Sequence, residues 1–192
     1  MLGRLPQTLD VGGISYDIRT DFRSILLVIA AFNDDELTDA EKLYVCLKQI
    51  YKKFESIPHD AYAEAYKQAV WFINCGEDPE KEGRKSPRTV NWIKDESLIF
   101  PAINRAAGQE VRLAKYMHWW SFMGYFQSID KESTYGYILM LRQKRAKGKK
   151  LEKWESEFWN NNRALCDLNL TASSGHDAES TLAEIYKQLQ KG

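Results

Sequence analysis

The residues best suited to acid–base chemistry near neutral pH are three histidines, His59, His118 and His176. They lie in separate segments, and none has a carboxylate or a cysteine at a spacing that defines a metal or nucleophile site. His118 lies among aromatic residues, but the sequence specifies no partner that would make it a base. We interpret it as a hydrogen-bonded core histidine, with an enzyme centred on His118 as the alternative.

Thiols and carboxylates also lack a catalytic pattern. Cys46, Cys75 and Cys166 are odd in number and far apart, and none forms a Cys-x-x-Cys pair, so neither a disulfide framework nor a zinc site is expected. The sequence has no nucleophile elbow, Gly-x-x-x-x-Gly-Lys loop or dinucleotide fingerprint. We therefore expect a protein that is not an enzyme, with no catalytic residue, no metal site and no cofactor.

The strongest local charge is the basic run over residues 142–150. Its candidate partner-binding residues are Arg142, Lys144, Arg145 and Lys147. The nearby aromatics Trp154, Phe158 and Trp159 are compatible with binding of single-stranded nucleic acid, by stacking beside basic side chains. However, helical spacing predicts that these aromatics belong to the core, and cations late in a helix stabilise its C-terminal end. Nucleic-acid binding through this run, including Lys149 and Lys150, is therefore kept as the less favoured alternative.

Composition bounds the protein class. The 192 residues suffice for one well-buried domain, whereas two full domains would be crowded. Lysine plus arginine equals aspartate plus glutamate at 27 each, so net charge supplies no long-range attraction to nucleic acid or membranes. No signal-peptide stretch precedes Pro6, and polar residues interrupt every apolar run. We expect a soluble protein of a reducing cytoplasm, without a membrane partner.

The elements that position these residues are mainly helices. Alternating residues around Gly12-Gly13 predict a β-hairpin over residues 8–18. Thr20 is predicted to cap a helix over 21–32, and Thr38 with Glu41 forms a capping-box signature for the next helix. A third helix is predicted to contain Pro58 in its first turn. These segments form a helical half over residues 20–75.

A loop over residues 76–90, rich in charge, glycine and proline, is predicted to join this half to a second one over 91–168. Pro101 predicts a kink or a restart of the helix near Phe100, and Gly108 a helix C-terminus. Ser133 or Thr134 is predicted to cap a later helix that runs into the basic segment.

An aromatic stretch over residues 113–126 is predicted to be a helix that begins at about Gln109. Because its large side chains point in nearly every direction at 100° per residue, we expect this helix to be buried on all sides. The predicted core residues are Trp119, Trp120, Phe122 and Phe126.

The C-terminal residues 171–192 are predicted to form a flexible linker and a short amphipathic helix. The apolar stripe of this helix, a second set of candidate partner-binding residues, is Leu182, Ile185, Tyr186 and Leu189. Docking of the stripe on its own domain is favoured over docking on another subunit or partner. The expected organisation is one mainly α domain over residues 1–170 with this short appendage.

Two motifs carry a family resemblance. The first is Leu9, Val11, Gly13, Tyr16, Ile18, Thr20, Asp21, Phe22 and Arg23. The second is Met117-His118-Trp119-Trp120-x-Phe122. Together they resemble the bacteriophage gene-product-fifteen family, whose members are encoded in the tail-assembly region of long-tailed phages and prophages. The resemblance extends over roughly residues 9–166.

This resemblance implies a role in virion assembly in the cytoplasm of the bacterial host. Proteins at this genomic position are commonly interpreted as tail assembly chaperones, which keep the tape-measure protein soluble until tail-tube subunits polymerise around it. The implied partner is thus the tape-measure or tail-tube protein, and a homo-oligomer would raise effective concentration along such a client. The alternative within phage biology is a structural tail or connector subunit of the virion.

Overall fold

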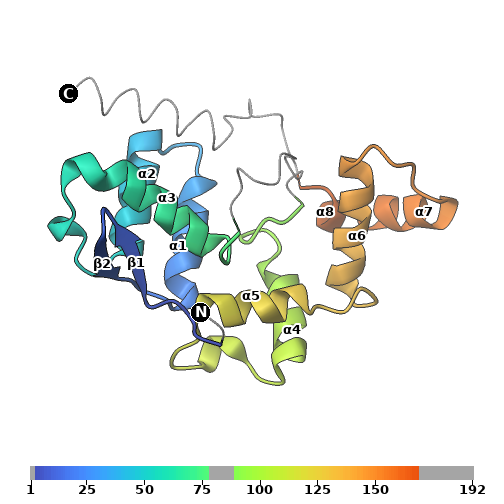
Figure 1. Ribbon diagram of the computed structural model, residues 1–192. Helices are drawn as coiled ribbons and strands as arrows, with labels where there is room; N and C mark the ends of the chain where they lie inside the picture. Colours follow the sequence, from blue (N-terminus) through green and yellow to red (C-terminus); the bar gives the residue numbers. More distant parts are fainter. Residues whose placement is uncertain (1–2, 78–88, 169–192) are drawn as a thin grey trace. The chain divides into compact units, whose positions relative to one another are not determined.

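The computed structural model of the protein describes residues 3–77 and 89–168 (Figure 1). These residues form a two-stranded hairpin followed by eight α-helices, so the predicted mainly α fold with an N-terminal β-hairpin is confirmed. Most of the predicted loop over 76–90 and the predicted C-terminal helix, with Leu182, Ile185, Tyr186 and Leu189, lie outside the described residues. Within the described ranges, no helix is long and apolar enough to cross a membrane.

The described chain divides into two compact units. Unit 1 contains residues 3–77 and Tyr116–Ser121, and unit 2 contains residues 89–115 and 122–168. One boundary between the units lies within the loop predicted over residues 76–90, and the short segment Tyr116–Ser121 belongs with the first unit. The sequence did not predict this assignment.

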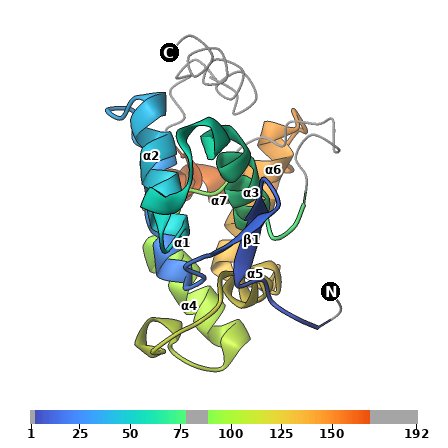
Figure 2. The ribbon, with the colours of Figure 1, turned by 60° about the vertical axis from the view of Figure 1, so that its left-hand side comes forward.

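The hairpin of unit 1 consists of β1 (Thr8–Val11) and β2 (Ile14–Asp17), with Val11 opposite Ile14. Gly12 and Gly13 both have positive φ, at 60° and 79°, as a two-residue turn of this type requires. On β1 the inward residues Leu9 and Val11 are buried, and β1 packs against α3 (Tyr62–Ile73; Figure 2). The helix supplies the apolar contact that an isolated hairpin lacks.

The helices α1 (Phe22–Phe32) and α2 (Asp39–Ile50) pack together in unit 1. The capping box of α2 is confirmed, because the Thr38 N–H donates to Glu41 Oε2 at 2.8 Å and the Glu41 N–H donates to Thr38 Oγ1 at 3.3 Å. The predicted cap of α1 is wrong by one residue. Asp21 is the N-cap, since its carboxylate accepts the Arg23 N–H.

The entry to α3 also differs from prediction. After η1 (Phe54–Ser56), Pro58 precedes the short 3₁₀-helix η2 (His59–Ala61), and α3 begins only at Tyr62. Pro58 therefore lies before the first turn of the α-helix. Its backbone is extended, with ψ of 146°, which is compatible with proline but not with a helix.

Unit 2 contains α4 (Glu96–Ala107), η3 (Val111–Leu113), α6 (Thr134–Ala146), α7 (Lys153–Asn161) and α8 (Arg163–Cys166). The helix ends predicted at Gly108, which has φ of 67°, and at Ser133, which caps α6, are confirmed. Of the kink or restart predicted near Phe100, the restart is wrong, because α4 continues through Pro101. Proline removes the donor for the Ser97 carbonyl, and because Ser97 is exposed, this carbonyl is not forced to remain without a hydrogen bond.

The predicted start of the aromatic helix is also wrong. The helix α5 spans Trp119–Gln127, and the residues just before it are extended and form a β-bridge between His118 and Asp21. In this bridge the Phe22 N–H donates to the Met117 carbonyl at 3.0 Å, and the Trp119 N–H donates to the Thr20 carbonyl at 2.7 Å. These backbone groups are thus committed to a segment distant in sequence and cannot form a helical turn.

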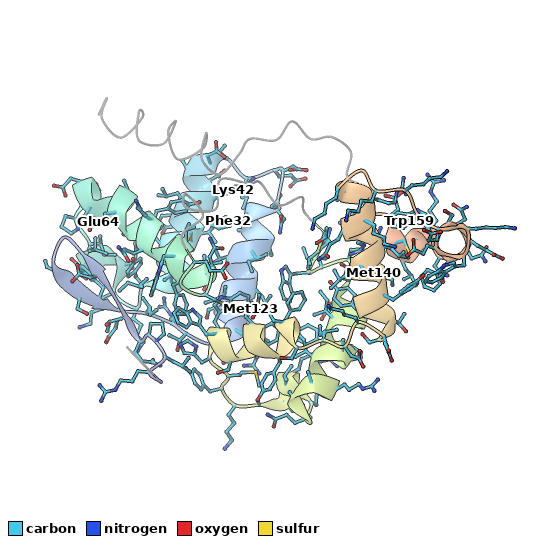
Figure 3. The ribbon with its side chains drawn as sticks, turned by 45° about the vertical axis from the view of Figure 1, so that its right-hand side comes forward. Phe32, Lys42, Glu64, Met123, Met140 and Trp159 are labelled. Carbon is cyan, nitrogen blue, oxygen red and sulfur yellow. The ribbon has the colours of Figure 1, made fainter. Side chains whose placement is uncertain are left out.

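The side chains of α5 are not buried on all sides as expected. Trp119 and Phe122 are fully buried, but Trp120 and Phe126 are half-buried, and Gly124 is exposed. Figure 3 draws the side chains of the described residues, with Met123 of α5 labelled. In unit 2, Phe122 and Phe126 pack against the Trp92 ring, at centroid distances of 6.0 and 4.9 Å.

Two indoles hold the C-terminal end of α3. The Trp119 indole N–H donates to the Ile73 carbonyl at 2.8 Å, and the Trp120 indole N–H donates to the Phe72 carbonyl at 2.9 Å. Ile73 is the last residue of α3, so its carbonyl lacks a partner within the helix and the Trp119 indole satisfies it. The Phe72 carbonyl accepts the Trp120 indole in addition to the Cys75 N–H, which donates to it at 3.1 Å. At Gly76 a Cβ atom would lie 3.2 Å from the Trp120 ring, which favours glycine there. We call this arrangement the tryptophan clamp.

The clamp predicts an unequal response to substitution of two tryptophans. Trp119→Phe should lower the free energy of unfolding by about 1–3 kcal/mol, because the part-buried Ile73 carbonyl loses its donor and volume of the buried Trp119 ring is lost. Trp154→Phe, at an exposed position, is the matched control and should change it by about 0.5 kcal/mol or less. Urea unfolding followed by circular dichroism measures both. Equal midpoints for the two variants would show that the clamp does not stabilise the fold.

Candidate partner-binding surface

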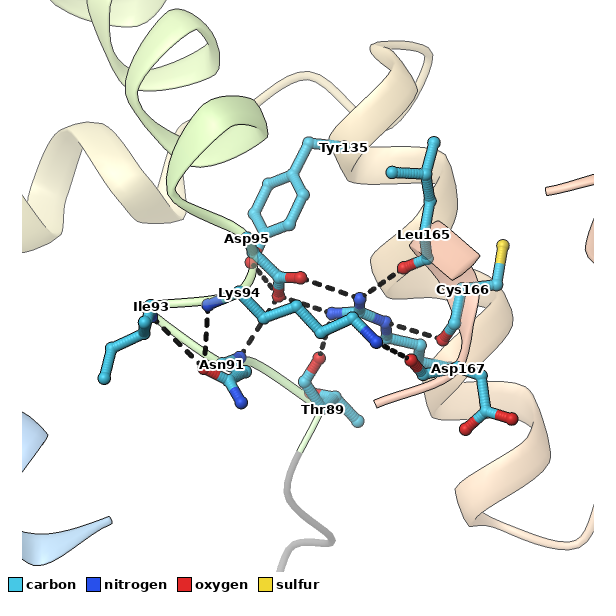
Figure 4. Close-up of polar contacts among 10 residues, drawn as sticks. Thr89, Asn91, Ile93, Lys94, Asp95, Tyr135, Leu165, Cys166 and Asp167 are labelled. Carbon is cyan, nitrogen blue, oxygen red and sulfur yellow. Dashed lines mark hydrogen bonds and ion pairs between the residues drawn. The ribbon is translucent and has the colours of Figure 1, made fainter. Parts of the chain in front are cut away.

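Arg142, the first residue of the predicted basic site, is buried in unit 2. Figure 4 shows the polar contacts in this part of the unit, with the hydrogen-bond partners Thr89, Asp95, Leu165 and Cys166 labelled. The Arg142 guanidinium forms a bidentate pair with Asp95, in which Nη1 donates to Oδ2 at 2.6 Å and Nη2 donates to Oδ1 at 2.8 Å. The other three hydrogen bonds go to backbone carbonyls. Nε donates to Cys166 at 3.0 Å, Nη1 to Thr89 at 3.0 Å and Nη2 to Leu165 at 2.6 Å. All five guanidinium donors are therefore used. With 4% of the residue exposed, Arg142 is unavailable to a partner, which corrects its predicted role.

Asp95 receives further hydrogen bonds at the start of α4. Its Oδ2 accepts the Asn91 N–H at 3.1 Å and the Tyr135 hydroxyl at 3.3 Å, while its carbonyl accepts the N–H groups of Leu98 and Ile99. Burial raises the pKa of Tyr135, and the neighbouring carboxylate of Asp95 raises it further. The pair of Asp95 and Arg142 thus joins α4, α6 and α8 within unit 2, which explains it as a structural element.

The next two cations of the basic run are also engaged within unit 2. Lys144 Nζ lies 2.5 Å from Oε1 of the buried Glu155 on α7. That hydrogen bond, together with the Glu152 N–H that donates to the same carboxylate, lowers the pKa of Glu155. The Arg145 guanidinium lies 4.4 Å from the centroid of the Trp159 ring, a residue labelled on α7 in Figure 3. Both cations therefore connect α6 to α7.

The exposed lysines of the basic run lie at the turn between α6 and α7. The exposed residues of this turn and of the first turn of α7 include Lys147, Lys149, Lys150, Lys153 and Trp154. The Trp154 ring stacks on the Tyr137 ring, with centroids 5.7 Å apart and planes at 15°. Together with Tyr137, these residues form what we call the α6–α7 surface.

Two aromatics of α7 differ from their predicted core role. Trp154 is 59% exposed and Phe158 is half-buried, whereas Trp159 is buried as predicted. The inner face of α7 is formed by Glu155 and Trp159, four positions apart, so Trp154 points away from it. Helical spacing predicted a core position for Trp154 together with Trp159, although positions five apart differ by about 140° around a helix. Attention to that angle is the signal that would have shown Trp154 to be exposed.

His118 belongs to unit 1 and is nearly fully buried. Its Nδ1 accepts the Trp120 N–H at 3.1 Å, which leaves Nε2 as the protonated nitrogen of the neutral ring. Nε2 then donates to the Pro6 carbonyl at 3.0 Å. The ring also meets Phe72 edge to face, at a centroid distance of 5.8 Å. The structure thus explains His118 as a hydrogen-bonded core histidine.

A shallow pocket of about 320 Å³ lies in unit 1 where the two sequence motifs meet. Its lining residues are Gln7, Ile18, Arg19, Thr20, Asp21, Ser24, Lys52 and Tyr116. The Thr20 hydroxyl and the Tyr116 hydroxyl are 2.7 Å apart, and Arg19 Nη1 donates to carbonyls that end α2, including that of Lys48 at 2.8 Å. These polar groups already have intramolecular partners. The sequence did not indicate the pocket, because Thr20 and Tyr116 are 96 positions apart.

The fold and the site define a mainly α-helical protein with an exposed basic and aromatic surface. Over residues 1–168 the sequence matches the family described as Bacteriophage Gp15 protein, so the chain belongs to that family and is a phage-related protein. The family resemblance inferred from the two motifs is thereby confirmed. No curated protein and no solved structure matches the chain.

The buried ion pair predicts a large effect of a single truncation. Arg142→Ala should lower the free energy of unfolding by about 3–5 kcal/mol, because Asp95 would remain buried without its counter-ion. Lys147→Ala, at an exposed position near the end of the same helix, is the control and should change it by about 0.5 kcal/mol or less. Thermal and urea unfolding test this. A melting curve for Arg142→Ala that overlays the parent curve would contradict the structural role.

The lowered pKa of Glu155 predicts a loss of stability in acid. A carboxylate whose pKa is lower in the folded state stabilises the fold above its unfolded pKa of about 4.5, and this contribution disappears as pH falls through the folded pKa. Glu155→Gln should therefore reduce the difference between the urea midpoints at pH 7 and pH 3. Glu157→Gln, on the exposed side of α7, is the control and should keep the parent difference. An unchanged difference in Glu155→Gln would refute the assignment.

Proposed function

We propose that this protein is a non-enzymatic tail assembly chaperone that binds the tape-measure or tail-tube protein in the cytoplasm of the bacterial host. The observation that carries the proposal is membership of the bacteriophage family over residues 1–168. The genomic position that the resemblance implies, in the tail-assembly region, connects this family to virion morphogenesis. The proposed activity is binding of an unassembled client rather than a reaction.

The contacts of the most reactive side chains support a binding role. Both ring nitrogens of His118 are used in hydrogen bonds to the backbone, and the Asp95 carboxylate and the Arg142 guanidinium neutralise each other in the core of unit 2. A catalytic base must reach the proton that it abstracts, and these groups are already held by intramolecular partners. Their chemistry is therefore explained by the fold.

Exposed apolar side chains are what a chaperone for a long helical client needs. In unit 1, Leu27 on α1 and Tyr44 on α2 are 56% and 47% exposed. In unit 2, Trp154 on α7 is exposed to a similar extent. Each unit thus has large apolar side chains at its own surface.

The structure weakens the alternative of nucleic-acid binding through residues 142–150. Arg142 is buried, Lys144 is paired with Glu155, and Arg145 covers the Trp159 ring. Half of the six cations assigned to that function are thus engaged by side chains of unit 2. Non-specific nucleic-acid affinity grows with the number of phosphates that a protein neutralises, so this loss favours a protein partner.

Co-expression with the tape-measure protein of the same phage tests the proposal. The soluble fraction of the tape-measure protein, measured by quantitative immunoblot, should rise several-fold with this chain and not with an unrelated helical protein of similar size. Mass spectrometry of purified virions should find the chain absent, since a chaperone leaves before maturation. A tape-measure protein that is equally insoluble with and without this chain refutes the chaperone function, and stoichiometric presence in virions would indicate a structural subunit instead.

A further inference from the structure

We propose that the α6–α7 surface binds an acidic amphipathic helix of a partner protein. The inference deepens the proposed function and rests on it, because the helix would belong to the client of the chaperone. Its basis is the combination, on one short part of unit 2, of exposed lysines and an exposed, stacked tryptophan.

The charge of this surface specifies an acidic partner. Lys147, Lys149, Lys150 and Lys153 are exposed within seven consecutive positions. The exposed carboxylate among them, Glu152, accepts a backbone N–H at the start of α7 as part of a capping box. The C-terminal end of α6 contributes a partial charge of about −0.5, which is too small to neutralise four ammonium groups. The net positive field therefore attracts carboxylates.

The aromatic part of the surface, with Trp154 as its anchor, requires apolar side chains in the same partner. The Trp154 ring is held on one face by Tyr137, which also contacts the edge of the Phe158 ring at a centroid distance of 4.8 Å. Leu151 and Phe158 are half-buried and pack against the apolar core cluster of unit 2. An anchor already fixed by stacking loses little conformational freedom on binding, so it favours affinity.

An amphipathic helix fits this combination better than a single strand of nucleic acid. Single-strand binding relies on successive aromatic platforms along a basic groove. Of the three aromatics on α7, Trp159 is buried and covered by Arg145, and Phe158 is half-buried, so Trp154 alone is well exposed. One apolar anchor flanked by lysines instead matches one apolar stripe flanked by carboxylates, as on a helix with leucines at i, i+3, i+4 and i+7.

Fluorescence anisotropy with the full chain tests this surface. The probe is a labelled peptide of about 18 residues, or five helical turns, with leucines at those positions and glutamates elsewhere. We expect binding that weakens with added salt, a loss of affinity of about tenfold or more in Trp154→Ala, and a similar loss in Lys147→Glu with Lys150→Glu. The matched controls Ile14→Ala and Lys52→Glu, at exposed positions of unit 1, should bind as the parent does.

Several results would overturn the inference. These are unchanged affinity in the Trp154 and lysine variants, tighter binding of the same peptide with lysines in place of glutamates, or tighter binding of a labelled oligothymidine. Circular dichroism checks that each variant is folded, and the lysine variants, which change exposed side chains, decide the outcome if Trp154→Ala is not folded.

If every variant still keeps the tape-measure protein soluble, the chaperone function stands and this surface is wrong. If the peptide binds as expected but the tape-measure protein stays insoluble, the α6–α7 surface stands and the chaperone function is wrong.

Discussion

The structure of unit 1 depends on the pairing of the strand-like segment before α5 with the residues that begin α1. Backbone hydrogen bonds join Met117 to Phe22 and Trp119 to Thr20, and the Asp21 carboxylate accepts the Met117 N–H across 96 positions of sequence. This pairing places the indoles of the tryptophan clamp on the last carbonyls of α3. A short segment thus satisfies backbone groups at two helix ends, which a local turn could not do.

Features determined by neighbouring residues were predictable, and features determined by distant ones were not. The hairpin turn at Gly12-Gly13, the capping box at Thr38 and the cap at Ser133 each require residues within four positions, and all three are present. The aromatic stretch was predicted as one long helix because its periodicity was considered in isolation. Pairing with Asp21 makes its first part extended, since tertiary hydrogen bonds outweigh local helix propensity.

The candidate site shows the same limit for charge. In the sequence the cations of residues 142–150 look equivalent, yet the structure separates them by partners that the run does not contain. Arg142 is buried and paired with Asp95, 47 positions away, and Lys144 Nζ donates a hydrogen bond to the Glu155 carboxylate. A cation that is paired with a fixed carboxylate is not available to bind a partner molecule. The exposed lysines that follow in the chain are therefore the cations of this run that can contact a partner.

The two motifs that identify the family describe its fold rather than its site. Thr20 to Phe22 and Met117 to Trp120 meet in unit 1, where they form the β-bridge, the histidine hydrogen bonds and the tryptophan clamp. A motif whose residues form hydrogen bonds with the backbone of their own unit identifies the architecture but does not specify what the protein binds. Partner choice must then be decided by side chains outside the motifs. The α6–α7 surface meets this condition, since its lysines and Trp154 belong to neither motif and can change without disturbing the pairing that holds unit 1 together.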